Sequence, residues 1–106
     1  MDAINMVTGK MPVLTVQTPD GPVKIRPNRN NECVLSFTDG ISLIISVENT
    51  GIDGQAEDVM YTGRYIDEHG KSVPGGHVYG SLEHLRKGVS VLVDARTRNG
   101  IHVMNA

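Results

Sequence analysis

Hydrophobic and polar residues alternate with a period of two along much of the chain. In the segment ISLIISV, residues 41–47, every second residue from Ile41 is aliphatic, and Ser42 and Ser46 fall on the opposite face. This alternation is typical of antiparallel strands that have one buried and one solvent-facing side. The same pattern predicts about eight strands, over residues 12–17, 22–26, 32–38, 41–48, 58–67, 71–79, 89–95 and 100–105.

Short glycine-containing turns separate these segments, with the sequences TPDG, TDG, EHGK and TRNG. Glycine reaches positive φ without strain, and Asp or Asn before it tolerates the same region. The pairs Asp39 with Gly40 and Asn99 with Gly100 are strong signals for tight hairpins. Hairpin-linked strands at this spacing predict an all-β fold, either a small antiparallel barrel or a sandwich.

One short helix is predicted near residues 81–88. Ser81 is a favourable N-cap, and Leu82 and Leu85 would form a buried stripe on the helix. Gly88 is predicted to end the helix, since glycine commonly follows the last helical residue.

Length and composition indicate a single β domain over residues 1–106, with an N-terminal arm at 1–11 and an acidic loop at 48–58. The net charge of −2 gives no electrostatic argument for nucleic acid or an anionic membrane. No signal peptide is recognisable, and no apolar run approaches the roughly 18 residues that span a membrane. The sequence therefore predicts a soluble cytoplasmic protein with no membrane partner, and leaves later incorporation into a larger particle open.

Residues able to carry out chemistry are scattered along the chain. Cys33 shares an alternating face with apolar neighbours, where an inert core thiol belongs. The histidines lack the spacing of a zinc site, and the adjacent Glu83 and His84 would point about 100° apart on a helix. We predict no catalytic residue, no metal and no cofactor. A small enzyme that combines His77, His84 and a carboxylate is the second alternative.

Four apolar residues fall on the faces opposite those predicted to be buried. Neighbouring strands could gather them into a patch, and such patches mark association surfaces. They could equally line a second inner face of a sandwich or lie under the helix. The residues are Ile44, Met60, Leu92 and Met104. On this basis we predict a non-catalytic protein-binding or assembly module that acts through a β-sheet surface, on itself or on another protein.

A basic stretch, KIRPNRNN at 24–31, supports a first alternative, a small β-barrel that binds anions or nucleic acid through a basic face. A second basic group surrounds the predicted helix and the last hairpin. Few aromatic residues are available to stack on bases, so nucleic acid is the less favoured partner. The residues predicted to serve this alternative are Lys24, Arg26, Arg29, Arg86 and Arg98.

The segment GGHVYG, residues 75–80, places His77 and Tyr79 on one face of a strand and Val78 on the other. The two ring side chains either line a pocket or lie on the outer wall of the barrel. We predict the outer wall.

The C-terminal segment SLEHLRKGVSVLVDARTRNGIHVMN, residues 81–105, is expected to contain a short helix, a glycine and a terminal hairpin. This layout is similar to that of small β-barrel joining proteins of tailed phages, and to that of many unrelated barrels. A viral accessory or particle component is one form that the assembly module predicted above could take. The similarity carries no specific residue signature and transfers no site.

Overall fold

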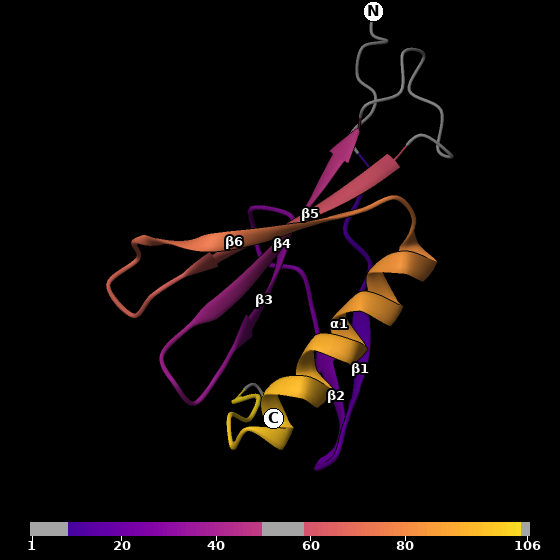
Figure 1. Cartoon of the computed structure of the whole chain (residues 1–106). Coiled ribbons are helices and arrows are strands. Elements are labelled where there is room, and N and C mark those ends of the chain that lie inside the picture. Colours follow the sequence, from indigo (N-terminus) through magenta and orange to yellow (C-terminus); the bar gives the residue numbers. More distant parts are fainter. Residues whose placement is uncertain (1–8, 50–58, 105–106) are drawn as a thin grey trace, which may run out of the picture.

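The computed structural model describes residues 9–49 and 59–104. Within them, six strands form two antiparallel sheets, and one helix follows the last strand (Figure 1). The predicted arm and acidic loop lie for the most part outside the described residues. The elements are β1 Leu14–Thr18, β2 Gly21–Ile25, β3 Glu32–Ser36, β4 Ser42–Asn49, β5 Val59–Ile66, β6 Ser72–Tyr79 and α1 Leu82–Arg98.

The expectation of a mostly β fold is confirmed, whereas the eight strands and the closed barrel are not. Strands β1 and β2 form a separate hairpin, and β3 to β6 form a four-stranded sheet in sequence order. The described strands do not close into a barrel, because β6 ends the second sheet without pairing back to another of these strands.

The predicted TPDG turn connects the two strands of the β1–β2 hairpin. Gly21 has a φ of 111°, and the Thr18 hydroxyl donates to the Gly21 carbonyl at 2.6 Å. Directly opposed residues such as Val16 and Val23 are buried, while Lys24 on the other side of β2 is exposed. The hairpin therefore presents one apolar side to the core and one polar side outward.

The four-stranded sheet has two different faces, set by the same alternation. We call inner the face that contributes to the hydrophobic core, and outer the opposite face. The inner face carries Cys33, Leu35, Leu43, Ile45, Tyr61 and Tyr79. Cross-strand partners share a face, so the register assigns Val34, Ile44, Met60, Thr62, Arg64 and Val78 to the outer face.

Helix α1 and the hairpin lie over the inner face and complete one core. The helix buries one residue at every fourth position, namely Leu85, Val89 and Val93. In Figure 1 the helix runs along the indigo hairpin, and the four-stranded sheet spreads away on the other side. In the described residues, no helix combines the length and the apolar character that crossing a membrane requires.

The helix predicted at 81–88 is confirmed, but the strand predicted at 89–95 is wrong, because the same helix continues over that segment. The helix starts as predicted, with the Ser81 hydroxyl accepting from the His84 amide at 3.1 Å. It then continues to Arg98. The predicted strand would have given Val89, Val91 and Val93 one common face. The helix instead buries Val89 and Val93 and leaves Val91 68% exposed.

Gly88 lies inside the helix rather than at its end. A Cβ atom added at Gly88 would lie 2.5 Å from Cε1 of Tyr79. Tyr79 is itself buried in the core, 7% exposed. A glycine is needed here because any side chain would separate the helix from β6.

The predicted C-terminal hairpin around Asn99 and Gly100 is also wrong, because these residues end the helix. The Ile101 amide donates to the Arg96 carbonyl and the Gly100 amide donates to that of Thr97, both at 2.9 Å. Gly100 has a φ of 81°, as the left-handed position of such a cap requires. The layout similar to that of phage joining proteins is therefore absent, since it depended on this hairpin.

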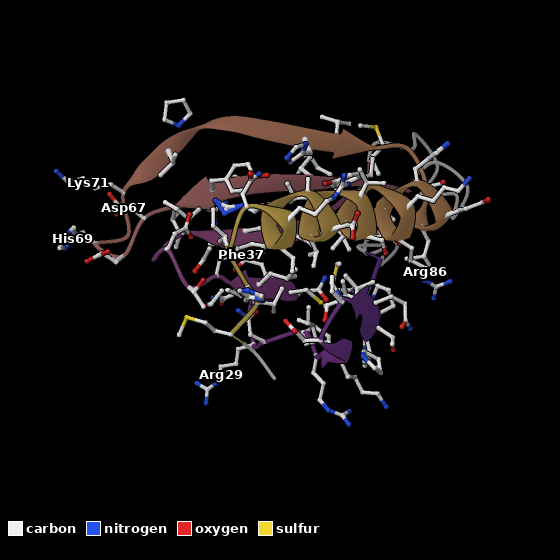
Figure 2. All side chains as sticks on the ribbon, turned by 60° about the horizontal axis from the view of Figure 1, so that its bottom comes forward. Arg29, Phe37, Asp67, His69, Lys71 and Arg86 are labelled. Carbon is white, nitrogen blue, oxygen red and sulfur yellow. The ribbon has the colours of Figure 1, made fainter. Side chains whose placement is uncertain are left out.

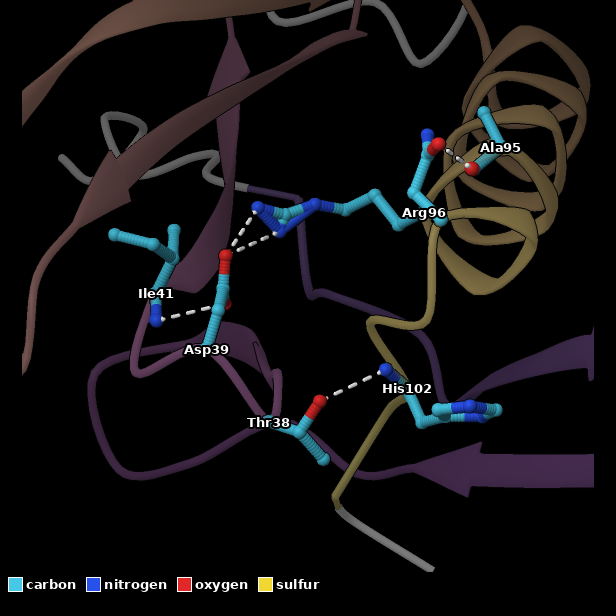
Figure 3. Close-up of polar contacts among 7 residues, drawn as sticks. Thr38, Asp39, Ile41, Ala95, Arg96 and His102 are labelled. Carbon is cyan, nitrogen blue, oxygen red and sulfur yellow. Dashed lines mark hydrogen bonds and ion pairs between the residues drawn. The ribbon is translucent and has the colours of Figure 1, made fainter.

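The chain after the helix returns to the edge of β3. In place of a strand at 100–105, the structure has a single bridge between Phe37 and Val103. Arg96, near the end of the helix, holds the β3–β4 turn. Both of its terminal nitrogens donate to Asp39 Oδ2, at 2.8 and 3.2 Å (Figure 3). Its guanidinium carbon also lies 4.6 Å from the centre of the Phe37 ring. The end of the helix is thus attached to the β3–β4 turn by an ion pair and a cation–π contact.

Candidate functional site

The outer face of the four-stranded sheet is the main open surface of the fold. The cluster of buried core residues contains none of its side chains, because the helix and the hairpin both pack on the inner face. Val78 on β6 is 67% exposed there. The apolar residues on this face are Val34, Ile44, Met60, Ile66 and Val78. An antiparallel sheet often has a solvated face, and polar side chains such as Ser42, Ser46 and Thr62 lie among the apolar ones here.

An ion pair crosses the middle of the outer face. Arg64 on β5 and Glu32 on β3 are joined at 3.4 Å, and the Ser46 hydroxyl also donates to Glu32 at 3.4 Å. Arg64 is opposite Ile44 in the register and Glu32 is opposite Ser46, so the pair passes over β4. This arrangement accounts for Ile44 being only 7% exposed on an otherwise open face.

The structure brings two of the four predicted interaction residues onto this face. Ile44 and Met60 both lie on it, and Met60 is opposite Glu48 in the register. Leu92 is half-buried against the core from the helix. Met104 is exposed, and its amide donates to the Ser36 carbonyl at the edge of β3. The strand assumed for residues 89–95 is what placed Leu92 in this set.

A hollow of about 360 Å³ borders the outer face, between β2 and β3. Its lining combines residues from the hairpin, from the turn after it and from the outer face. The residues are Lys24, Ile25, Arg26, Asn28, Glu32 and Val34. Two residues of the predicted basic set thus lie beside the apolar sheet surface. The sequence alone does not show that these two segments lie side by side.

The other three basic residues lie elsewhere. Figure 2 shows Arg29 and Arg86 well apart, with Arg86 on the helix. Arg98 is paired with Asp94 at 2.7 Å on the helix surface. The structure therefore does not gather the five basic side chains on one face.

His77 and Tyr79 lie on the inner face, so the prediction that they occupy an outer wall is wrong. The Tyr65 hydroxyl and His77 Nε2 share a hydrogen bond of 2.6 Å. The His77 ring stacks on the Tyr79 ring, with 5.8 Å between the ring centres. Burial, and secondarily Tyr65, raise the pKa of Tyr79 to about 12. Burial also raises the pKa of Tyr65, although Arg96 opposes this. Both phenols are therefore protonated at neutral pH, and the cluster is a packed part of the fold.

The groups considered for catalysis have separate partners. His84 contacts the Ser81 hydroxyl at 3.0 Å, whereas His77 contacts Tyr65. Among residues 9–49 and 59–104, no three His, Cys, Asp or Glu side chains are placed to share a metal ion. Cys33 is fully buried, and burial raises the pKa of its thiol to about 11. This thiol is therefore protonated and unreactive at neutral pH.

Comparisons with protein-family models, curated proteins and solved structures found no match to this chain. The outer face and the hollow share Glu32 and Val34, so they form one continuous surface.

Proposed function

We propose that the protein is a non-catalytic binding or assembly module whose partner, a protein, docks on the outer face of the four-stranded sheet. The observation that carries this proposal is a sheet face that bears apolar side chains on all four strands and has no described core element across it. Apolar surface of this kind is typical of association sites.

The arrangement of polar and apolar groups on this face resembles that of a protein interface. Val78 is opposite Thr62 in the register, and Met60, two residues from Thr62, is a diagonal neighbour of Val78. Arg64 lies two residues beyond Thr62 on the same face, and its ion pair with Glu32 crosses the neighbouring strand β4. Protein interfaces are enriched in arginine and methionine beside their apolar contacts.

The edge of the sheet offers a second contact for the same partner. Strand β6 ends the sheet, and its ladder is with β5. A partner strand could pair with such an edge. Pro74 has no amide hydrogen and Gly75 has a φ of 109°, so this pairing would be confined to Gly76–Tyr79. A second copy of the chain and a different protein can both use this edge.

The proposal predicts that Val78→Asp weakens partner binding. Val91 on the helix is the matched control, because it is the same residue type and is 68% exposed against 67% for Val78. A charge within a docking surface must be desolvated on binding, and we expect a loss of about tenfold or more in affinity. The measurement is quantitative capture from a lysate of the source organism, together with light scattering for self-association.

Proteins retained by wild type and by Val91→Asp but lost by Val78→Asp would support the outer face as the docking site. Equal capture and equal mass for all three proteins would rule it out. Circular dichroism of both variants controls for unfolding, which is not expected at positions so exposed.

A further inference from the structure

The hollow between β2 and β3 has an apolar floor and a basic rim. Ile25 is buried and Val34 is half-buried, while Lys24 is exposed on the outer side of β2 and Arg26 is exposed directly after the strand. The volume of about 360 Å³ lies within the range of binding pockets, about 300 to 1,000 Å³. The hollow is therefore large enough to receive side chains from another molecule.

The electrostatics of the rim favour an anionic group. In the described part of the chain, ion pairs involve neither Lys24 nor Arg26. The one carboxylate of the lining, Glu32, is already engaged by Arg64 and by the Ser46 hydroxyl. Within residues 9–49 and 59–104, two cations without an ion-pair partner thus lie beside a carboxylate that already contacts Arg64.

The wall of the hollow is fixed in place before any ligand binds. The Asn28 side chain accepts from the amides of Asn30 and Glu32, at 2.9 and 3.0 Å, and the Asn28 amide donates to the Glu32 carbonyl at 2.8 Å. Asn31, with a φ of 61°, holds the preceding chain, since its side chain bonds the Met11 amide and the Gly9 carbonyl. A wall that is already ordered lowers the entropic penalty of binding.

We propose that this hollow is the specificity pocket of the docking surface, and that it takes an apolar side chain flanked by carboxylates from an extended segment of the partner. The apolar side chain would contact Val34 above the buried Ile25, and the carboxylates would meet Lys24 and Arg26. The inference rests on the proposed function. Charge complementarity selects an acidic segment over a basic one.

The test uses the full chain and a labelled peptide with one leucine between Asp and Glu residues. Two control peptides replace the acids by lysine, or the leucine by serine. Binding is followed by amide chemical shifts at low and at physiological salt. We expect the acidic peptide to move the signals of Lys24, Arg26 and Val34, to bind more weakly as salt rises, and to lose affinity when leucine is replaced.

A pair of charge-reversal variants separates the hollow from general electrostatics. Lys24→Glu with Arg26→Glu alters the rim, and Arg86→Glu with Lys87→Glu makes the same change in net charge on the exposed surface of the helix. The first variant should bind the acidic peptide about tenfold more weakly or worse, and the second should change affinity less than about threefold.

No binding of the acidic peptide at low salt, or an equal loss in both variants, would overturn the inference. Tighter binding of a single-stranded oligonucleotide than of the peptide, lost with Lys24 and Arg26, would overturn it in favour of nucleic acid. Failure here is distinguishable from failure of the proposed function. If Val78→Asp still weakens partner capture while the peptide does not bind, the hollow is not the specificity pocket, but the outer face remains the docking site.

Discussion

Replacing Gly88 with leucine should lower the free energy of unfolding by about 3 kcal/mol or more. The added Cβ alone would lie 2.5 Å from Cε1 of Tyr79, and the buried Tyr79 ring has little room to move. Leucine is a better helix former than glycine by about 0.8 kcal/mol, so helix propensity acts in the opposite direction. The loss therefore reports the close packing of helix α1 against β6. Urea unfolding measures it.

Ala95→Leu is the control for this substitution, because Ala95 is exposed on the same helix. It should change stability by less than about 0.5 kcal/mol. A double-mutant cycle with Tyr79→Ala should show strong coupling, since the smaller side chain removes the obstruction. If Gly88→Leu is neutral or stabilising, the helix does not pass Tyr79 at this distance.

Phe37→Ala should destabilise the fold by about 3–5 kcal/mol. Phe37 is 1% exposed, carries the Arg96 guanidinium over its ring, and bridges to Val103. Truncation leaves a cavity and removes the cation–π contact that helps attach the end of the helix. Stability by urea unfolding, combined with hydrogen exchange of the chain after the helix, measures both effects.

Phe37→Leu keeps most of the apolar volume and should lose less than half as much stability as the alanine variant. In the alanine variant, the amides of His102 and Met104, which bond Thr38 and Ser36, should exchange faster. An effect below about 1 kcal/mol for Phe37→Ala would show that this corner does not hold the helix.

The strands could be predicted well where alternation and turn chemistry agreed. The segment around Ile41 to Val47 alternates cleanly, and the DG turn before it forms as expected, with Gly40 at a φ of 88°. Closure into a barrel could not be predicted, because alternation fixes which side of a strand is apolar but not which strands become neighbours.

The second half of the C-terminal helix was not predicted, because its sequence satisfies two periods. Val89, Val91 and Val93 alternate as in a strand, while Leu85, Val89 and Val93 repeat every four residues as in a helix. Two glycines favoured the wrong choice. Gly88 resembles a helix end but allows Tyr79 to approach, and Asn99 with Gly100 resembles a hairpin turn but caps the helix.

For the candidate site residues, the sequence predicts only which side chains share a face of a strand. Alternation correctly placed Val78 on the opposite face from His77 and Tyr79. Which of the two sides faces the core depends on where the helix packs, and the helix was not predicted at its full length. The hollow was not foreseeable either, since it joins Lys24 on one sheet to Val34 on the other.

The central claim, that a partner protein docks on the outer face, is tested most directly by site-specific photo-crosslinking. A photoreactive amino acid is placed at Val78, or at the equally exposed Val91 on the helix, and each protein is irradiated in a lysate of the source organism. We expect a discrete crosslinked protein, or a crosslinked dimer, from position 78 and none from position 91. Crosslinks from position 91 alone, or identical products from both positions, would contradict it.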